Sequence, residues 1–362
     1  MTTYVNGRFL TQHPSGMQRW AEQMLLALDA RLARADGSRS VVVLRPDRAA
    51  RSPNFRHIEM RAVGRLSGHA WEQLELAVAA HDGTLVNLLS SGPLAHPRMI
   101  STFHDAAVMR HPELFSRSYS MLHRALRPRL ARRSKRLLTV SAFSAGELAE
   151  TLGVPKDRFA VAPNAADHLK AVIPRPDVLR AHGLTAGAYG LCIGNQTPNK
   201  NVAAAIAAVE RLGRPDLRLV LVGAGEARVF GSFDLAEQQF VTSLGFVDDG
   251  ALRSLYENAA FLCFPSRYEG FGIPVLEAMS LNCPVIASDA GALVETASGA
   301  ALHCPADDID GFAAAMASVL DDAGLAEDLR RRGQRRAAAF SWDRSAAVLD
   351  CMLAEFAAET ES

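Results

Sequence analysis

The sequence predicts an α/β protein with two Rossmann-like, doubly wound parallel-sheet domains. A chain of 362 residues exceeds the usual size of one hydrophobic core, so two domains are expected. Short apolar runs rich in Val, Leu and Ile alternate with longer amphipathic segments, a pattern typical of repeated βα units. Residues 165–186 interrupt this pattern with prolines and polar side chains, and we interpret them as a linker. The expected domains are therefore 1–168 and 169–340, followed by a C-terminal helix, 341–362, that returns across the interdomain region.

The βα pattern provides each domain with strands and covering helices. The two clearest helices are 16–32 and 201–212. The expected strands are short, apolar runs at 40–45, 84–89, 99–103, 137–141, 159–163, 190–194, 217–223, 241–247, 261–266 and 284–288. Strands of this composition are buried on both faces, so each parallel sheet should carry helices on both sides.

Composition excludes several classes of protein. An apolar fraction of 49% with 22% charged residues is that of an ordinary globular chain, and no apolar run approaches the roughly 20 residues that span a bilayer. The N-terminal stretch "MTTYVNGRFLTQ" has no basic segment followed by an apolar one, so a cytoplasmic location is expected. The cysteines are odd in number and show no CxxC spacing, which favours buried thiols over zinc ligands or disulfides.

Charge is distributed unevenly between the two halves of a chain whose formal net charge is zero. Up to Asn164 there are 23 Lys and Arg against 13 Asp and Glu, and after it 16 against 26. The densest basic run, "RALRPRLARRSKR" at 124–136, is either a solvated helix face or a contact for an anionic membrane surface or lipid phosphate. Nucleic acid is not expected, because no recognised binding module accompanies the run and aromatic residues are sparse there.

The candidate chemistry lies in loops that follow strands, because doubly wound sheets bind ligands beyond the carboxyl ends of their strands. "SRYEGFGIPVLEAM", 266–279, follows one such strand, and Pro274 suits the first turn of a helix. Its glycines allow a ligand to approach the backbone, and a helix N-terminus attracts an anion. Glu277 is expected in the first helical turn, where the dipole favours any carboxylate. Glu269 precedes the glycines and would face the same cavity as the anion.

Two further loops carry candidate residues, each with an ordinary structural alternative. In "CIGNQTPNKN", 192–201, Lys200 stands just before a helix and is either a partner for a diphosphate or an exposed lysine at a helix end. In "STFHDA", 101–106, His104 and Asp105 follow a buried strand. A histidine at such a place can bind hydroxyls or transfer protons, or it can be a hydrogen-bonded core residue.

A fourth loop opens the chain's first long helix. In "HPSGMQRW", Gly16 precedes the helix and Ser15 is a candidate N-cap. This arrangement could admit a phosphate to the helix N-terminus, or it could be an ordinary cap.

Two other patterns are misleading. "VGAGEA", 222–227, has Arg228 where the third glycine of a dinucleotide fingerprint belongs, so a nicotinamide cofactor is poorly supported. "DDID", 307–310, contains a DxD that could suggest a metal-bound nucleotide sugar, but it precedes an Ala-rich helix and is better explained as a cap.

Together these loops resemble the retaining glycosyltransferases of family 4, whose GT-B fold has two Rossmann-like domains facing across a cleft. "YEGFGIPVLEAM" looks like the family's E-x7-E signature, "TFHDAAVMRHPELF" like its histidine loop and "GNQTPNKN" like its Gly-x(n)-Lys-Asn loop. "TVSAFSAGEL", "VAPN", "LGFVDDGALRSLYENA" and "FSWDRSA" follow in the family's order, so the resemblance covers nearly the whole chain. The opening "YVNGRFLTQHPSGMQRWAEQM" is similar to bacterial polysaccharide-assembly members, many of them mannosyltransferases that use GDP-mannose.

The resemblance implies that the domain 1–168 binds the acceptor and that the domain 169–340 binds the nucleotide-sugar donor. It also implies roles for three catalytic residues and for a donor-binding set. His104 would hold the donor sugar near the reacting carbon, Glu269 would contact its hydroxyls, and Lys200 would neutralise the departing diphosphate. The set that would contact the rest of the donor through side chains or backbone groups is Gly16, Asn199, Val247, Arg267, Phe271, Gly272, Ile273 and Glu277.

Within that set the implied contacts differ in kind. Glu277 would bind the ribose diol, Val247 the base through its main chain, and Gly16 would lie by the phosphates. Asp105 would lie on the acceptor side. The resemblance implies no cofactor and no metal, since a lysine and a helix N-terminus can stabilise the departing diphosphate without one.

The chain departs from the family pattern at two positions. Asn199 stands where family members often have a second basic residue, so diphosphate binding is either weaker or borrows Arg267 or Arg19. Ala165 stands where a glycine is common, so that turn is expected to differ.

The sequence therefore indicates a glycosyltransferase that moves a hexose, with mannose from GDP-mannose as the best candidate, to a glycan or lipid-linked saccharide. Its location would be cytoplasmic, with possible peripheral contact between the basic first domain and an anionic membrane. The alternatives are a GT-B nucleotide-sugar epimerase or phosphorylase, a non-catalytic nucleotide-sugar binding module and, less well supported, an oxidoreductase.

Overall fold

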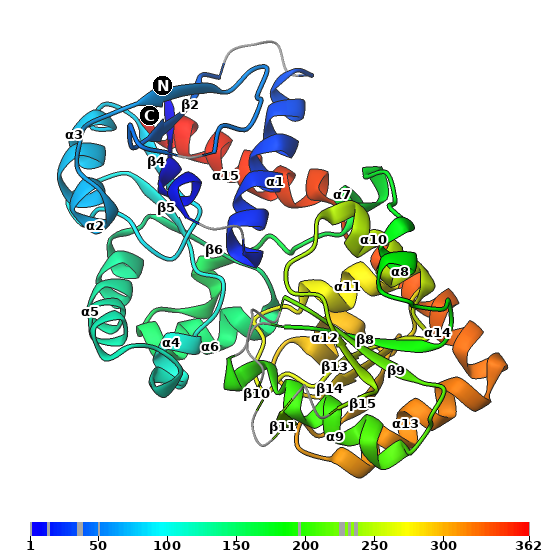
Figure 1. Cartoon of the computed structure of the whole chain (residues 1–362). Coiled ribbons are helices and arrows are strands. Elements are labelled where there is room, and N and C mark those ends of the chain that lie inside the picture. Colours follow the sequence, from blue (N-terminus) through cyan, green and yellow to red (C-terminus); the bar gives the residue numbers. More distant parts are fainter. Residues whose placement is uncertain are drawn as a thin grey trace. The chain divides into compact units, whose positions relative to one another are not determined.

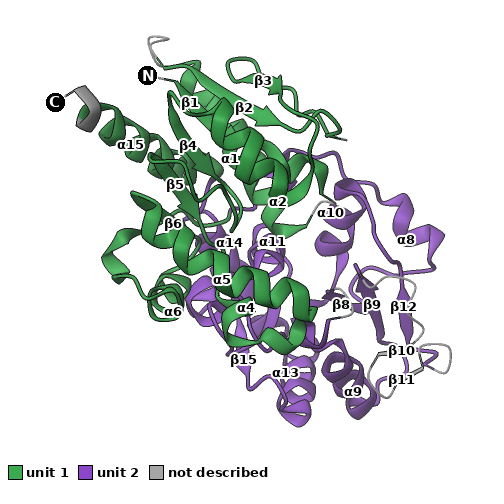
Figure 2. Cartoon of the chain, turned by 90° about the vertical axis from the view of Figure 1, so that its left-hand side faces the viewer, with its two compact units in different colours: residues 1–164, 342–362 green, residues 165–341 purple. Residues whose placement is uncertain are grey.

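The computed structural model describes residues 2–12, 15–34, 39–49, 51–194, 197–223, 229–230, 233–234 and 238–361. The chain divides into two compact units: unit 1 comprises Met1–Asn164 with Trp342–Ser362, and unit 2 comprises Ala165–Ser341 (Figure 2). Three expected features lie partly outside the described residues: positions 13–14 of the first glycine loop, 195–196 of the lysine loop, and 224–228 of the GxG stretch.

Unit 1 is built on a parallel sheet of seven strands in the order β3-β2-β1-β4-β5-β6-β7 (Figure 1). The strands are β1 (Thr3–Asn6), β2 (Val41–Arg45), β3 (Glu59–Ala62), β4 (Thr84–Asn87), β5 (Met99–Thr102), β6 (Arg136–Thr139) and β7 (Phe159–Val161). Chain order runs outward in both directions from the β1–β4 pair. That pair is therefore the topological switch point of unit 1.

The helices of unit 1 cover both faces of this sheet. They are α1 (Gly16–Leu32), α2 (Gly68–Trp71), α3 (Ala77–Ala79), α4 (Ala107–Arg110), α5 (Arg117–Arg133), α6 (Ala142–Leu152) and α15 (Trp342–Glu361). One buried cluster joins alternate strand residues such as Val42 and Leu44 to Leu130 of α5 and Leu148 of α6. Helix α15 packs on α1, and the Ser345 hydroxyl donates to the carbonyl of Pro163 at 2.6 Å. The last helix thus belongs to unit 1.

Unit 2 repeats this plan with six parallel strands in the order β12-β9-β8-β13-β14-β15 (Figure 1). They are β8 (Tyr189–Ile193), β9 (Arg218–Val222), β12 (Val241–Ser243), β13 (Phe261–Phe264), β14 (Val285–Ser288) and β15 (Leu302–Cys304). A separate two-stranded antiparallel ladder is formed by β10 (Val229–Phe230) and β11 (Phe233–Asp234). The order reverses between β8 and β13, which makes this pair the switch point of unit 2.

The helices of unit 2 are α7 (Asp167–Ala171), α8 (Asp177–Ala181), α9 (Val202–Leu212), α10 (Asp249–Asn258), α11 (Ile273–Ser280), α12 (Leu293–Ala297), α13 (Ile309–Asp321) and α14 (Ala323–Ala337). The stretch 165–186, interpreted from its sequence as a linker, instead contains α7 and α8, which pack on α10 and α11 within unit 2. Its prolines separate two short helices rather than two domains.

The two sheets confirm the predicted doubly wound α/β architecture. All ten expected strands are present, several of them shorter than expected at one end. The structure also contains short strands of two to four residues that were not predicted from the sequence: β1, β3, β15 and the pair β10–β11. No helix in the described part of the chain is long and apolar enough to cross a membrane.

Candidate active site

The switch point of unit 2 brings two predicted loops together. Strands β8 and β13 are hydrogen-bonded neighbours, and the loops that follow them contain Lys200 and Glu269. Since parallel strands end at the same edge of a sheet, both loops lie beyond that edge. The site is therefore built from segments almost seventy residues apart in the sequence.

Lys200 and Glu269 form an ion pair across these loops. The Lys200 Nζ donates to Glu269 Oε1 at 2.6 Å, and it lies 5.2 Å from the centroid of the Phe264 ring. The two side chains are 24% and 13% exposed, so a ligand can reach both. Gly194 allows the lysine to approach β8, because a Cβ there would lie 2.9 Å from Lys200 Cβ. The pair presents a cation and an anion at one small, partly desolvated surface.

Asn199 and Arg267 hold the same two loops against each other. The Asn199 amide donates to the carbonyl of Tyr268 at 2.7 Å, and the Arg267 backbone N–H donates to the carbonyl of Asn199 at 2.8 Å. The Arg267 guanidinium donates to the carbonyl of Pro198 at 2.8 Å and pairs with Asp307 at 2.6 Å. Both side chains therefore bind other parts of unit 2, and they hold the loops of Lys200 and Glu269 in place.

Helix α11 begins beside this ion pair. Its N-cap, Gly272, has φ +90°, and no side chain caps the first turn. This positive φ favours glycine, and a Cβ at Gly272 would also meet Cδ2 of Leu293 at 2.4 Å. The carbonyl of Phe271 is turned inward, where it accepts a hydrogen bond from the Thr296 hydroxyl at 2.5 Å. Ile273 begins the helix, Pro274 has no N–H, and the Val275 N–H donates to the carbonyl of Gly272 at 3.1 Å, so the Ile273 amide is the first-turn group that can face an anion.

Glu277 is placed differently from its sequence expectation. It lies in the second turn of α11 rather than the first, because the helix begins at Ile273, so its position does not place it at the helix N-terminus. The side chain is buried, accepts a hydrogen bond from the Tyr256 hydroxyl at 3.0 Å, and lies 3.7 Å from Nε2 of His168. Its carboxylate is therefore held by neighbours from α10 and α7.

Val247 lies on the same edge of the sheet, in the loop after β12. It is half-buried and directly precedes Asp248, whose side chain accepts a hydrogen bond from the Ala251 N–H at 2.8 Å and so caps α10. The cap fixes the direction of the backbone at Val247.

His104 is buried in unit 1, directly after β5. Its ring Nε2 lies 2.9 Å from the carbonyl of Leu88 and must donate to it, which leaves Nδ1 as the acceptor of the neutral ring. The ring meets that of Trp20 edge-on, with centroids 4.9 Å apart. Burial lowers the pKa of His104, so the ring is held neutral in the folded chain.

Asp105 and Gly16 start helices in unit 1. The Asp105 carboxylate accepts a hydrogen bond from the Ala107 N–H at 2.9 Å, at the start of α4. Gly16 is the first residue of α1, and its neighbour Ser15 forms no side-chain hydrogen bond to the helix backbone. The first-turn amides of α1 are therefore not capped by Ser15.

A polar cluster that the sequence analysis did not single out lies at the switch point of unit 1. The Glu72 carboxylate is fully buried and binds Asn6, Arg8, His69 and Ser91. Its sequence signal was weak, because β1 is only four residues long and was not recognised as a strand. Without β1, the residues that follow it could not be placed at a carboxyl edge.

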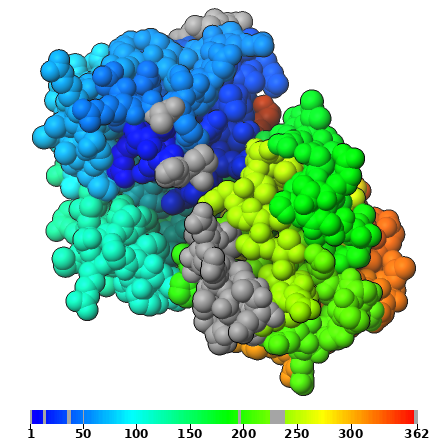
Figure 3. Space-filling model, viewed as in Figure 1, coloured from blue at the N-terminus to red at the C-terminus, as the bar shows by residue number. Residues whose placement is uncertain are grey.

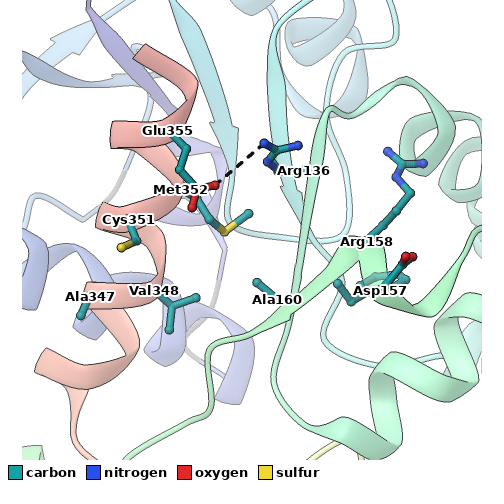
Figure 4. A pocket seen from close by; sticks show the side chains of 10 residues that line it. Arg136, Asp157, Arg158, Ala160, Ala347, Val348, Cys351, Met352 and Glu355 are labelled. Atoms are coloured by element: carbon teal, nitrogen blue, oxygen red, sulfur yellow. Dashed lines mark ion pairs between the residues drawn. The ribbon is translucent and has the colours of Figure 1, made fainter. Parts of the chain in front are cut away.

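A cavity of about 490 Å³ lies elsewhere in unit 1 (Figure 4). It is bounded by α15 and by the amino ends of β6 and β7, with Arg136 3.9 Å from Glu355 across it. The carboxyl ends of the strands, where the candidate residues lie, are at the opposite edge of the sheet. This cavity is therefore separate from the candidate site.

Two family models match the chain. The one described as glycosyl transferases group 1 matches residues 184–336, and the one described as glycosyltransferase family 4 matches residues 21–170. The matched segments fall almost entirely in unit 2 and unit 1, respectively. The candidate residues Lys200 and Glu269 lie in the first segment and His104 in the second.

Similar proteins agree on fold and family. The O-antigen chain mannosyltransferase B of Escherichia coli is 32% identical over 68% of this chain and 67% of its own length. A glycogen synthase of Mycobacterium tuberculosis is 31% identical over 67% of this chain and 60% of its own length. The solved sucrose-phosphate synthase of Thermosynechococcus elongatus superposes with a TM-score of 0.76 over 99% of both chains, at 18% identity. The two sheets therefore form a GT-B fold.

Proposed function

The chain belongs to the glycosyltransferases of family 4, and on that premise we propose that it moves a mannosyl residue from GDP-mannose to a saccharide or lipid-linked saccharide. The transfer would retain the anomeric configuration and need no metal ion. The single observation that carries the proposal is the pairing of Lys200 with Glu269 beside the uncapped start of α11.

The arrangement suits departure of a nucleoside diphosphate. As the bond to the sugar breaks, negative charge develops on the diphosphate, and fixed positive groups aimed at it lower the barrier. Lys200 supplies a full positive charge, and the backbone amides at the start of α11 supply partial ones. Both belong to unit 2, on adjacent loops, so they are held in place before the donor arrives.

Glu269 would act on the donor sugar. Its carboxylate is an acceptor for sugar hydroxyls, and because it pairs with Lys200 those hydroxyls would lie next to the diphosphate. Glu277, held by Tyr256, would accept hydrogen bonds from the ribose diol. In unit 1, the neutral His104 would offer its Nδ1 lone pair to a hydroxyl of the transferred sugar.

The proposal also specifies the transferred sugar, mannose, and the nucleotide base, guanine. The E. coli relative is named for mannosyl transfer to an O-antigen chain, which supports mannose, whereas the glycogen synthase relative makes a different sugar and base the main competitors. A thermal-shift panel of GDP, UDP and ADP would decide the base, since a ligand that binds only the folded chain raises its melting temperature. We expect GDP to raise it and UDP not to.

The transfer itself is tested by release of GDP. With GDP-mannose and a mannose-terminated oligosaccharide, release should depend on the acceptor and should persist in EDTA. Neither an epimerase nor a phosphorylase would show acceptor-dependent release, and a binding module would bind GDP without releasing it from the sugar. Glu269→Ala should abolish turnover while GDP still binds. Glu210→Ala, at an exposed position on α9, is the matched control and should turn over normally. Unchanged turnover by Glu269→Ala would refute the catalytic assignment.

Peripheral contact with an anionic membrane is the remaining part of the proposal, and helix α5 supports it. Residues 117–133, which form α5, reach the molecular surface on the face shown in Figure 3. The helix exposes Tyr119, Met121 and Leu122, with Met121 74% exposed, beside basic residues such as Arg124. Apolar side chains set among arginines suit the interface of an anionic bilayer. The chain should co-sediment with phosphatidylglycerol vesicles at low salt. The double substitution Met121→Ser and Leu122→Ser should reduce the fraction that co-sediments.

A further inference from the structure

Glu277 has a different neighbour at each oxygen of its carboxylate, and one of them is a histidine that was not singled out from the sequence. The Tyr256 hydroxyl of α10 donates to Oε2 at 3.0 Å, and Nε2 of His168 on α7 lies 3.7 Å from Oε1. The side chains of Glu277 and His168 are each 6% exposed. His168 was not noticed because residues 165–186 were interpreted as a linker, whereas the structure makes α7 part of unit 2.

Both neighbours compensate the burial of this carboxylate. Removing a charge from water is costly unless a hydrogen bond or an opposite charge offsets the loss. The single hydroxyl proton of Tyr256 is shared, because the same oxygen lies 3.3 Å from the carbonyl of Pro274. The imidazole of His168 places a basic group beside the other oxygen of Glu277. His168 therefore adds to the compensation that Tyr256 supplies.

The distance of 3.7 Å distinguishes the contact with His168 from the bond with Tyr256. It lies within the range of an ion pair but exceeds that of a hydrogen bond, so the ring acts on Oε1 without occupying one of its lone pairs. A carboxylate has about four acceptor positions, which suffice for Tyr256 and for the two hydroxyls of a diol. The contact with His168 is thus compatible with ligand binding by Glu277.

Helix α7 is fixed at the position that this contact requires. It packs on α10 and α11 within unit 2 (Figure 1). The Arg253 guanidinium of α10 donates to the carbonyls of Lys170 at 2.8 Å and Val172 at 2.6 Å, at the end of α7. Leu169, next to His168, is fully buried. Because the short helix is held through its backbone and through a core residue, the imidazole has a defined position beside Glu277.

We propose that His168 is a positioning residue for the donor's ribose: it holds the carboxylate of Glu277 in the orientation in which both hydroxyls of the ribose diol donate to it. The terminal torsion of a glutamate is soft, so one hydrogen bond, from Tyr256, leaves the carboxylate able to rotate. A second contact at Oε1 restricts that rotation, as supporting residues do in preorganised sites. This inference rests on the proposed function, because it adds a residue to the ribose contact assigned there to Glu277.

The test compares GDP with 2′,3′-dideoxy-GDP, which lacks both ribose hydroxyls, by calorimetry on the full chain. The measured quantity is the ratio of the two dissociation constants. We expect the unchanged protein to prefer GDP by about tenfold or more, the effect of hydrogen bonds to a charged group. The amide of His168→Asn does not reach the position of Nε2, so this variant should lose most of the preference by binding GDP more weakly. The longer side chain of His168→Gln brings an amide close to that position and should retain most of it.

Further measurements separate positioning from folding. His182→Asn, at an exposed histidine of unit 2, is the matched control and should bind both nucleotides as the unchanged protein does. In the transfer reaction His168→Asn should raise the KM for the donor with little change in kcat, since the ribose does not react. Each variant's melting temperature shows whether it is folded. A loss of packing alone would weaken the binding of GDP and dideoxy-GDP equally.

The outcomes also separate this inference from the proposed function. Folded His168→Asn and His168→Gln that both keep the full preference for GDP, or that bind both nucleotides equally weakly, would overturn the role of His168 and leave the proposed function standing. An unchanged protein that binds GDP and dideoxy-GDP equally would remove the ribose contact from Glu277, and this inference with it. Where UDP or ADP binds instead of GDP, the same comparison uses the dideoxy form of that nucleotide. Failure of the unchanged protein to bind any of the three would refute the proposed function itself.

Discussion

Gly291→Ala should disable the donor site by moving the backbone of Glu269. Gly291 has φ +62°, and a Cβ there would lie 2.5 Å from the carbonyl oxygen and 2.9 Å from the nitrogen of Glu269. The same carbonyl accepts a hydrogen bond from the Ala292 N–H at 3.0 Å, so the two loops are already in close contact. Because the obstructing atoms are backbone rather than a flexible side chain, the loop that carries Glu269 must shift.

The size of the effect follows by comparison with Gly299→Ala. Gly299 also has positive φ, +78°, but a Cβ there meets nothing within 4 Å. Gly299→Ala should therefore lower the free energy of unfolding only by the cost of an alanine in the left-handed conformation, about 1–2 kcal/mol. Gly291→Ala adds an overpacking cost of about 1–3 kcal/mol. At roughly 2–4 °C per kcal/mol for a unit of this size, it should melt several degrees below the control.

The assay pairs thermal unfolding with steady-state transfer. Gly299→Ala should transfer sugar at close to the normal rate, whereas Gly291→Ala should lose about a hundredfold in kcat/KM, since a shift of about 1 Å in a catalytic group can cost that much. Equal melting temperatures and equal kcat/KM for the two variants would refute the argument that Gly291 fixes the position of Glu269.

Three further predictions follow from the described contacts. Tyr256→Phe removes the 3.0 Å hydrogen bond to Glu277 and should raise the KM for the donor several-fold with little change in kcat, as measured by initial rates; an unchanged KM would separate Glu277 from nucleotide binding. His123 has a pKa near 4 when folded against an ordinary value of 6.5, so the unfolded chain binds the extra proton between these values and stability falls as pH drops from 6.5 to 4, by up to about 3 kcal/mol. His123→Phe should flatten that part of a urea-unfolding profile, and an equally steep profile in the variant would contradict the assignment. Of the five cysteines only Cys351 is exposed, so a thiol reagent such as dithionitrobenzoate should titrate one group in the folded chain and five after denaturation; more than one in the folded state would contradict the burial of the rest.

The fold was predictable because most of its strands can be recognised from their composition. Runs such as "VVVL" in β2 and "FLCF" in β13 are apolar throughout, as strands buried on both faces must be, and β13 is followed by helix α11. β1 was not predicted, because its four residues, "TYVN", are too few to show a pattern that distinguishes a strand from a loop. Pairing with β2 and β4 makes it a central strand, and such pairing cannot be read from local sequence.

The candidate site was predictable where sequence position determines geometry. A lysine and a glutamate after adjacent parallel strands must lie at one edge of the sheet, and the 2.6 Å contact of Lys200 with Glu269 has that origin. Helix register was harder, since one glycine more or less at the start of α11 moves Glu277 between turns. The partners of Glu72 were beyond prediction, because they come from segments up to 66 residues away that only the folded sheet brings together.

Titration of GDP into the full chain by calorimetry, with EDTA present, tests the central claim most directly. The claim is that Lys200 and the start of α11 bind the diphosphate without a metal ion. The account predicts binding in EDTA that Lys200→Met weakens at least tenfold, while Lys170→Met, at an exposed position in unit 2, leaves it unchanged. Binding that requires a divalent ion, or that is equally tight in Lys200→Met, would contradict the account.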